Sequence, residues 1–553
     1  MCVEPGPFCS QVFAGLEEVM AVRMVKFGLL IALTLSSLPS SARLPDGRFN
    51  ANIFRSPGIP RVVLEGSSVP VVSRNGTELP PYSTVYYFDQ LIDHNNPSLG
   101  TFKQRYWHTY EFYEPGGPII LMTPGEGNAD GYYGYLTNRT INGLIAQQQN
   151  ASTVVLEHRF YGFSNPRPDL SVKSLKLHTI QQAVDDLVYF AKTVKLPMPG
   201  GDQVTPDKTP WILTGGSYSG ALTSWTMVRD FWEYFEPIRL HMPANCSADV
   251  QAVIAHVDKT FSGNNATAIQ VLKETFGLGN MTHLDDVAGA LRNNLWDWQS
   301  LQPTTGPGGK FYQFCDALEV KDDVNAPASG WGLDHALAAW GSYFKNTYYA
   351  QREYFLSLLM NSLMNIDQVC NGLDSECNEV GYLQEGAPKG HPTLVSRLVQ
   401  PPYDLRQCQL MFPEAFPEPP KTAISETNKV YKGWNVQLDR LFFANGQRDP
   451  WKDATVSATR HTVQSTPHQP IYIGDGFHCS DLMTLAGQVD PTINTVQVAA
   501  LEYFRTWLAQ WKPSTAPHTP SNVKVSPAVT DKMAIVYDGV LKPINAFVKG
   551  MGI

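Results

Sequence analysis

The amino-acid sequence predicts an α/β fold that is interrupted by a long, mainly helical insertion. Short apolar runs of the kind that form buried parallel strands occur in two groups, one in the first half of the chain and one near its end. An amphipathic helical segment lies between two runs of the first group, as in a unit of strand, crossover helix and parallel strand. Helix-like segments with glycine and proline breaks fill the chain between the two groups.

The individual elements follow from these patterns. The helical segment carries Ile180, Val184, Leu187, Val188 and Ala191, which we expect to form one buried stripe. A last helix is expected near the end of the second group, over residues 495–511. The strands are expected at 104–113, 118–126, 152–162 and 211–217, and then at 440–446 and 469–476.

These elements divide the chain into a core and an inserted cap. We expect the first part of the core at 85–231, a helical cap at 232–435 and the second part of the core at 436–512. The proline-rich stretch 43–84 is typical of a linker or propeptide, and 513–553 forms a tail to which the sequence assigns no role.

The first 42 residues predict a secretory signal behind an upstream extension. Arg23 and Lys26 precede an apolar run at 27–35, and the small residues at 40–42 resemble a cleavage site. Because the segment before Met24 carries acidic residues, we expect translation to start at Met24. The signal predicts an extracellular, vacuolar or lysosomal protein, and no later apolar run is long enough to span a bilayer.

Secretion also predicts disulfides and glycans. Six of the 8 cysteines follow the signal, a number compatible with three bridges, and the absence of a Cys-x-x-Cys pair disfavours zinc. The net charge of -9 gives no basic footprint for nucleic acid. Sequons that predict surface glycosylation begin at Asn75, Asn138, Asn150, Asn245, Asn265 and Asn280.

The stretch WILTGGSYSG has the pattern of a strand that runs into a nucleophile elbow. In an α/β-hydrolase the nucleophile needs small residues two positions before and two after it. Ser217 has Gly215 and Ser219 there, whereas Ser219 has Ser217 and Ala221 and lies too far beyond the strand. The sequence therefore favours Ser217, with Ser219 as the small residue of the turn.

Two later strand ends supply the remaining members of a catalytic triad. Asp449 follows the strand at 440–446 and His478 follows the strand at 469–476, in the order that this fold uses. His478 is expected to take the proton of Ser217, and Asp449 to orient the imidazole. The other aspartates near His478 are too close in sequence to hold it, and His158 precedes the serine and so breaks the order.

An oxyanion hole requires two N–H donors and no cofactor. The backbone of Tyr218, directly after the nucleophile, is expected to supply one donor. The other is expected from the glycine-rich loop after the strand at 118–126, at Gly125 or Glu126.

Five motifs together resemble one peptidase family. TPGEGNADGY, EHRFYG, GGSYSGALT, ANGQRDPW and GFHCSDL occur in this order and resemble the secreted serine peptidases that include lysosomal Pro-Xaa carboxypeptidase, dipeptidyl peptidase II and fungal acid prolyl endopeptidases. The fungal branch is the most similar, and the resemblance extends over residues 87–511. It implies an α/β-hydrolase with a helical cap that cleaves on the carboxyl side of proline at acid pH. Whether the chain acts as an exopeptidase or an endopeptidase stays open.

The same resemblance implies roles for individual residues. Ser217, Asp449 and His478 match the family's triad, and Tyr218 matches its oxyanion donor. Trp451 matches an aromatic residue beside the proline pocket, although it could equally pack the aspartate loop. The resemblance also pairs Cys377 with Cys408.

Two departures from the family favour alternative hypotheses. No apolar strand-like run lies between Ser217 and Trp232, where relatives carry about two dozen more residues, and the tryptophan-bearing stretch before Cys377 is absent. A lost central strand would expose sheet edges and leave core volume empty. The gaps fit mis-drawn exon boundaries or a catalytically impaired glycoprotein, and a secreted esterase would use the same triad.

Overall fold

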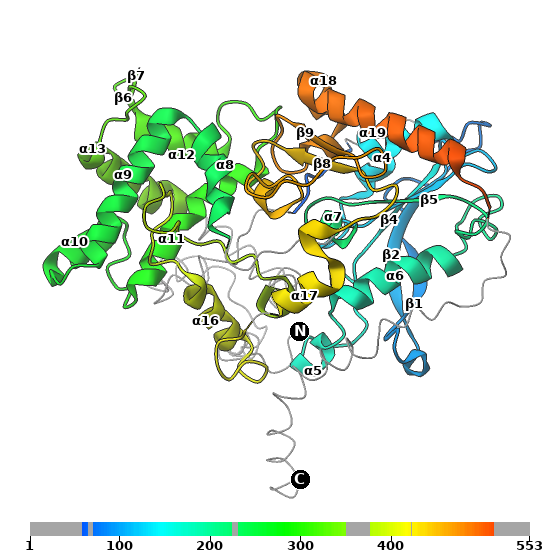
Figure 1. The fold of residues 1–553 in the computed structure, drawn as a ribbon, viewed down its shortest axis with the longest axis horizontal. Coiled ribbons are helices and arrows are strands. Elements are labelled where there is room, and N and C mark those ends of the chain that lie inside the picture. The colour runs from blue at the N-terminus through cyan, green and yellow to red at the C-terminus, as the bar shows by residue number, and fades with distance from the viewer. Residues whose placement is uncertain (1–57, 65–69, 224–230, 350–375, 422, 514–553) are drawn as a thin grey trace, which may run out of the picture.

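The structure is a computed structural model that describes residues 58–64, 70–223, 231–349, 376–421 and 423–513. The expected signal peptide, almost all of the expected C-terminal tail and part of the expected cap lie outside these residues. The described chain has a part built on a sheet and a part built of helices, which lie beside each other in Figure 1.

A five-stranded mixed sheet forms the first part, in the order β1-β2-β4-β3-β5. The strands β3, β4 and β5 are parallel, as their apolar sequences predict, whereas β2 pairs antiparallel with both β1 and β4. Strand β1 has alternating exposure on the sheet edge and was not predicted. The bounds are β1 Tyr86–Leu91, β2 Thr101–Thr109, β3 Ile119–Met122, β4 Ser152–Leu156 and β5 Trp211–Thr214.

Helices cover both faces of this sheet. Helix α6 (Ile180–Thr193) packs on one face through Leu187 and Phe190, and α4 (Ile141–Gln149) packs on the other beside α19 (Pro491–Gln510). The predicted stripe of α6 is wrong at Val188, which is 44% exposed. The buried face instead runs through Ile180, Ala183, Leu187 and Phe190, because the helix turns Val188 away from β1 and toward solvent.

The strands β8 (Phe443–Gly446) and β9 (Ile471–Gly474) form a separate two-stranded parallel sheet. Among the described strands, β5 pairs only with β3, so its other edge has no partner there. Leu213 in β5 is accordingly 40% exposed, whereas all residues of β3 and β4 are buried. The lack of a predicted strand after Ser217 therefore corresponds to an edge of the sheet.

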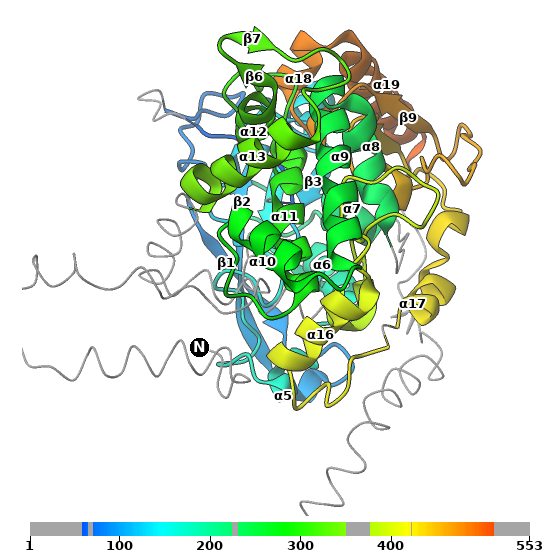
Figure 2. The same cartoon turned by 90° about the vertical axis from the view of Figure 1, so that its left-hand side faces the viewer.

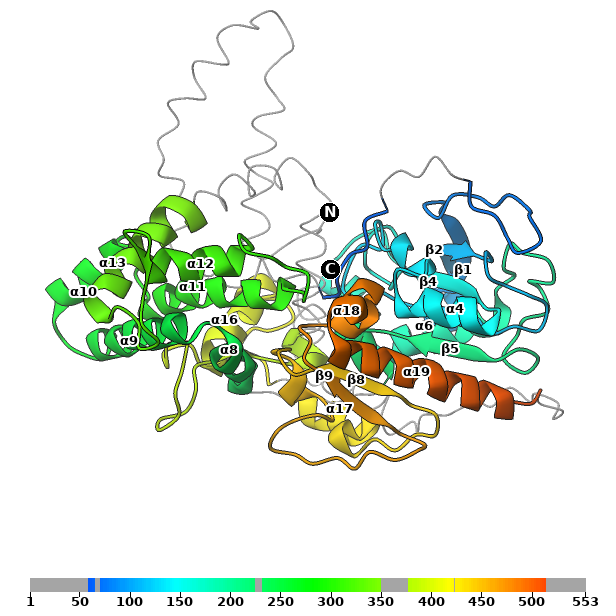
Figure 3. The same ribbon diagram turned by 90° about the horizontal axis from the view of Figure 1, so that it is seen from above.

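Helices dominate residues 232–435, as Figures 2 and 3 show for the green and yellow segments. The helices are α8 (Phe235–His241), α9 (Ala244–Phe261), α10 (Ala266–Thr275), α11 (Leu284–Trp296), α12 (Lys310–Glu319), α13 (Leu333–Tyr343), α16 (Pro401–Met411) and α17 (Ile424–Tyr431). The described residues of this part also include the 3-10 helices η4 (Trp232–Tyr234), η5 (Asp297–Ser300) and η8 (Gly433–Asn435), the π-helical segments η6 (Phe344–Tyr348) and η7 (Glu376–Val380), and a hairpin of β6 (Val320–Lys321) and β7 (Val324–Asn325). Shorter elements of the sheet part are η2 (Pro97–Leu99), η3 (Tyr133–Leu136), α5 (Val172–Leu175), α7 (Ser217–Thr223), η9 (Lys452–Ala454), η10 (Ser480–Leu482) and α18 (Thr484–Val489).

Two disulfides lie in the helical part, Cys246–Cys315 and Cys377–Cys408. The number of cysteines is compatible with three bridges, but Cys479 is a free, buried thiol in the sheet part. Cys370 lies outside the described residues. None of the helices that the structure describes is both long and apolar enough to cross a membrane.

Candidate active site

Ser217 lies in a sharp turn between β5 and α7. Its φ of 56° is in the left-handed region, which is unusual for a residue other than glycine and is often found at functional turns. Gly215 leaves no room for a side chain, because an added β-carbon would collide with the backbone of Ser219. The hydroxyl of Ser219 is fully buried and donates to Gly216 O at 2.7 Å, so this side chain holds the turn.

Asp449 and His478 follow β8 and β9 and form a buried pair. His478 Nδ1 lies 2.9 and 3.0 Å from the two carboxylate oxygens of Asp449. The backbone N–H of Trp451 also donates to Asp449 Oδ1, at 2.9 Å. His478 is 2% exposed and Asp449 6%, so the imidazole is held in one orientation within a water-poor environment.

Two opposing effects set the pKa of His478. Burial alone would lower it, but the charge of Asp449 raises it, and the neighbouring Cys479 and the hydrogen bond to Asp449 raise it further, so the net pKa lies well above the ordinary value. The other ring nitrogen, Nε2, is buried and has no hydrogen-bond partner within the described ranges. The histidine–aspartate half of a triad is therefore formed, while Ser217 and His478 are not hydrogen-bonded to each other.

The elbow nevertheless packs against the segment that carries the histidine. A β-carbon placed on Gly216 would lie 2.9 Å from Cys479 Sγ and 2.7 Å from Leu482 Cδ1. Gly216 precedes Ser217 and Cys479 follows His478 in the chain. The carboxyl ends of β5 and β9 thus bring the serine and the histidine into one region, as the order of the strands predicts.

The loop after β3 lies directly on the elbow. Gly125 has a φ of +77°, and a β-carbon there would lie 3.3 Å from Ser219 N and from Tyr218 Cδ1. Gly125 is buried and Glu126 is exposed. Burial, followed by the charges of Glu126 and Glu379, raises the pKa of Tyr218 well above its usual value, so its phenol stays protonated. This loop and the first turn of α7 can together present backbone N–H groups beside Ser217.

A buried ion pair supports that loop, and the sequence reasoning missed it. Glu157 is fully buried and accepts hydrogen bonds from Arg105 Nε at 2.9 Å and Ala129 N at 3.0 Å. Arg105 also donates to Asn128 Oδ1 at 2.9 Å and lies 3.2 Å from Asp130. Because Asn128, Ala129 and Asp130 belong to the loop after β3, the pair fixes this loop to β2 and β4. The only sequence signal was that Glu157 begins the EHRFYG motif.

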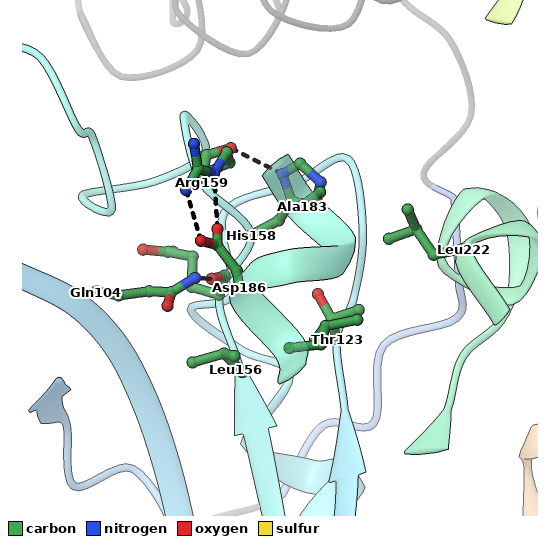
Figure 4. A pocket seen from close by; sticks show the side chains of 10 residues that line it. Gln104, Thr123, Leu156, His158, Arg159, Ala183, Asp186 and Leu222 are labelled. Atoms are coloured by element: carbon green, nitrogen blue, oxygen red, sulfur yellow. Dashed lines mark hydrogen bonds and ion pairs between the residues drawn. The ribbon is translucent and has the colours of Figure 1, made fainter. Parts of the chain in front are cut away.

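His158 has a structural environment rather than that of a general base. It lines a small pocket behind the elbow together with Thr123 and Leu222, and Figure 4 shows it beside the Arg159–Asp186 ion pair. Its Nδ1 lies 2.7 Å from Arg159 O, and burial, with His178, lowers the pKa of His158 to about 3. The prediction that His158 is not the base agrees with this geometry.

Trp451 belongs to a group of aromatic rings next to Asp449. Its ring stacks on Phe231 at a centroid distance of 5.6 Å, and Tyr234 and Tyr382 meet it edge-on at 5.1 Å each. Its indole N–H donates to Gln299 Oε1 at 2.9 Å. These contacts fix the ring beside the histidine–aspartate pair, and Trp451 remains partly exposed.

The sequon asparagines differ in their exposure. Asn75, Asn138, Asn265 and Asn280 are exposed, whereas Asn150 and Asn245 are half-buried. Asn265 Oδ1 caps α10 by accepting from Ala268 N. The described ranges contain no group of three or more His, Cys, Asp or Glu side chains arranged to hold a metal ion.

The chain matches a known family of peptidases over the residues of this site. The family model described as serine carboxypeptidase S28 matches residues 90–232 and 368–497, which include Ser217, Asp449 and His478. A serine protease of Bipolaris victoriae (strain FI3), vicPa, is 31% identical over 76% of this chain and 88% of its own length. The chain belongs to the S28 family. The resemblance seen in the motifs is therefore confirmed, and the protein is a serine peptidase.

Other S28 relatives differ more. A probable extracellular serine carboxypeptidase of Arthroderma benhamiae is 30% identical over 74% of this chain and 64% of its own length. The human thymus-specific serine protease is 24% identical over 78% of this chain and 88% of its own length. The S28 match stops at residue 232 and resumes at 368, so most of the helical part lies outside it.

Proposed function

We propose that this S28 peptidase hydrolyses peptides on the carboxyl side of proline, with Ser217, His478 and Asp449 as its triad. The observation that carries the proposal is the joint placement of an elbow serine and a buried histidine–aspartate pair at the carboxyl ends of β5, β8 and β9. This is the arrangement of an α/β-hydrolase, with residues 85–231 and 436–512 as the core and 232–435 as the cap.

The chemistry follows from the protonation states. His478 Nε2, which has no other partner among the described residues, accepts the proton of Ser217 Oγ as the oxygen attacks the substrate carbonyl carbon. Asp449 keeps the other nitrogen protonated and stabilises the imidazolium. The imidazolium then protonates the leaving amine, and a water molecule hydrolyses the acyl-serine by the reverse sequence. The bond that breaks is the one on the carboxyl side of proline.

The remaining groups supply the oxyanion hole and the specificity pocket. The backbone N–H of Tyr218 and an N–H of the Gly125–Glu126 loop are proposed as the two donors, because that loop packs on the elbow. Trp451 is proposed as one wall of the proline pocket. A flat aromatic surface suits a pyrrolidine ring, and the rings around Trp451 hold it in place without requiring substrate.

The resemblance also implies that the protein is active at acid pH. The raised pKa of His478 predicts the opposite dependence of activity on pH. Only a neutral imidazole can accept the serine proton, and the pKa of His478 is raised. Activity is therefore expected to fall as the pH drops below the neutral range. We also propose that the protein is secreted and is glycosylated at the six sequons. The extracellular relative of Arthroderma benhamiae supports the secretion part.

The test is hydrolysis of a blocked peptide that ends in proline p-nitroanilide, compared with the same peptide ending in alanine. The wild type is expected to prefer the proline substrate. Ser217→Ala is expected to lose about 10³-fold or more in kcat/KM, since the nucleophile and its base act as a unit. Equal rates for the wild type and Ser217→Ala, with both proteins folded, would refute the proposal.

A second candidate is a catalytically impaired S28 glycoprotein. Two observations favour it: β5 has an unpaired edge among the described strands, and Ser217 and His478 share no hydrogen bond. In this alternative, the absence of a strand beside β5 leaves Ser217 and His478 wrongly placed for proton transfer between them. The same assay separates the candidates, because an impaired protein gives the same rate as its Ser217→Ala variant.

A further inference from the structure

The described chain begins beside the nucleophile. A β-carbon placed on Gly58 would lie 3.5 Å from Ser217 Oγ and 3.7 Å from Ser217 Cβ, which are its nearest contacts among the described residues beyond its own chain neighbours. The next residue, Ile59, is 1% exposed and reaches to 3.0 Å from the β-carbon position of Gly216. A peptide carbonyl must come within about 3–3.5 Å of a serine oxygen to react. The backbone of Gly58 therefore takes up space directly beside the serine oxygen.

Residues 58–64, called here the N-terminal segment, are held by side chains on and next to η3. One of these contacts is a cation–π contact, in which the guanidinium of Arg61 lies 5.2 Å from the centroid of the Tyr132 ring. The hydrogen bonds run from Tyr132 OH to Ile59 O (3.4 Å), from Tyr135 OH to Pro60 O (2.7 Å) and from Arg139 to Val63 O (3.0 Å). Bonds to main-chain oxygens read the path of a peptide backbone rather than its side chains, which is how proteins hold extended peptides.

Gly134 makes this path possible. A β-carbon there would lie 2.5 Å from Val62 O and 2.6 Å from Val62 Cβ, and its three nearest neighbours all belong to Val62. Gly134 is not among the residues with positive φ, so its own backbone conformation accepts an alanine. Because Gly134 has no side chain, it leaves room for Val62 of the N-terminal segment, which is its nearest neighbour among the described residues.

We propose that the N-terminal segment is an intramolecular inhibitor that is bound along η3 with its Gly58 end at Ser217. The inference rests on the proposed function, since it treats Ser217 as the nucleophile. The segment competes with peptide substrate for the space in front of the serine oxygen. It precedes the residues that the S28 model matches, which begin at residue 90, so it is additional to the matched part of the fold.

The alternative is that the segment is merely part of the core. Ile59 and Val62 do pack with Trp107, Ile120 and Tyr135, so the segment contributes buried apolar surface in either case. The two interpretations predict opposite changes in activity when the segment is loosened. Loosening a core segment lowers both stability and activity, whereas loosening an inhibitor lowers stability slightly and raises activity.

The test uses the full chain with Gly134→Ala, and Gly306→Ala as the matched control. Within the described part of the chain, no atom beyond its own neighbours lies within 4 Å of a β-carbon position on Gly306, and its φ is not positive, so the control adds the same methyl group without a collision. Gly134→Ala is expected to raise kcat/KM on the proline substrate about tenfold or more, with Gly306→Ala at the wild-type value. An unchanged or lower kcat/KM for Gly134→Ala, at a melting temperature near that of the wild type, overturns the proposal.

A binding measurement separates this proposal from the proposed function. In a Ser217→Ala background, which needs no turnover, a fluorescent proline-containing hexapeptide is expected to bind Gly134→Ala about tenfold more tightly than the Gly134 protein. Equal affinities overturn the inhibitor even if the peptidase is active. Tighter binding supports it even if no turnover is found.

A second variant guards against misfolding. If Gly134→Ala does not fold, Tyr135→Phe replaces it in both measurements, because the change removes the hydroxyl that donates to Pro60 O at 2.7 Å and otherwise makes only a long contact of 3.8 Å with Met483 Sδ within the described residues. The loss of one such hydrogen bond corresponds to a two- to tenfold tighter binding of the hexapeptide, about the range of a single neutral bond. No gain in binding for Tyr135→Phe overturns the proposal.

Discussion

At the scale of single residues, Asp449 controls both the orientation and the charge of His478. Its carboxylate lies within 3.0 Å of Nδ1 through both oxygens, and it receives a further hydrogen bond from Trp451 N. The pKa of His478 is raised because this attraction outweighs the effect of burial. The carboxylate therefore decides over which pH range the histidine is neutral and able to act as a base.

Replacing Asp449 with asparagine tests this control. Asp449→Asn is expected to lower kcat by about 10⁴-fold, because the amide no longer fixes the productive tautomer. Without the negative charge the imidazolium is less stable. The pH at which the remaining activity is lost on acidification should therefore move downward relative to the wild type, in which the pKa of His478 is raised. The measurement is kcat/KM from pH 4 to 9 for both proteins, and full wild-type activity at pH 4 would contradict the account of His478.

The sequence predicts those residues whose proposed roles depend on order and spacing. Ser217, Asp449 and His478 each follow an apolar strand, and this rule needs no knowledge of side-chain contacts. It could not identify Gly58, because nothing in residues 43–84 shows that this part of a proline-rich stretch packs on η3. It also could not show that Cys479 stays free, since an even number of cysteines says nothing about distances.

At the scale of elements, the Arg105–Glu157 pair joins the carboxyl end of β4 to the loop after β3. Glu157 is fully buried and Arg105 is 5% exposed, so each charge depends on the other. Because the loop carries Gly125 and Glu126, the pair acts on the proposed oxyanion hole through the backbone. Glu157 is therefore a positioning residue.

Replacing Glu157 with glutamine is expected to destabilise the protein by about 3 kcal/mol, since the buried guanidinium of Arg105 would lose its buried partner and keep only the half-exposed carboxylate of Asp130. Glu114→Gln serves as the control, because it breaks the exposed Arg74–Glu114 pair and should cost less than about 1 kcal/mol. Urea unfolding measures both changes. Equal midpoints for the two variants would show that the buried pair does not hold the loop.

The strands with apolar sequences were predictable and the alternating edge strand β1 was not. The strands β3, β4 and β5 lie within the predicted runs because their sequences have the apolar character of buried parallel strands, although β5 is an edge among the described strands. Strand β1 alternates in exposure and carries Asp89 and Gln90, so it lacks that signal. The stripe of α6 was misjudged at Val188 because apolar periodicity alone does not reveal which side of a helix meets the sheet.

At the scale of the whole molecule, the two sheets divide the candidate site. Ser217 follows the five-stranded sheet, and Asp449 and His478 follow the pair β8 and β9. No described strand lies against the free edge of β5, and the two halves of the site are joined instead by contacts such as that of the Gly216 backbone with Cys479 and the backbone bridge between Thr140 and Met483. The sequence predicted this edge from a missing apolar run, but it could not predict how closely the halves would still pack.

Hydrogen exchange tests whether that edge is open in solution. Backbone amides of β5 are expected to exchange about tenfold faster than those of β4, which is flanked by β2 and β3 and fully buried. The peptides that cover the two strands are compared in one experiment. Equal protection of β5 and β4 would mean that another segment covers the β5 edge.

The central claim is that Ser217 is a nucleophile activated by His478. Covalent labelling with a small fluorophosphonate, mapped by mass spectrometry of the digested protein, tests it most directly. The wild type is expected to carry the label on Ser217 and to react at least about 10³-fold faster than His478→Ala, because the free hydroxyl is a weak nucleophile. Labelling of Ser219, or equal labelling rates for the wild type and His478→Ala, would contradict it.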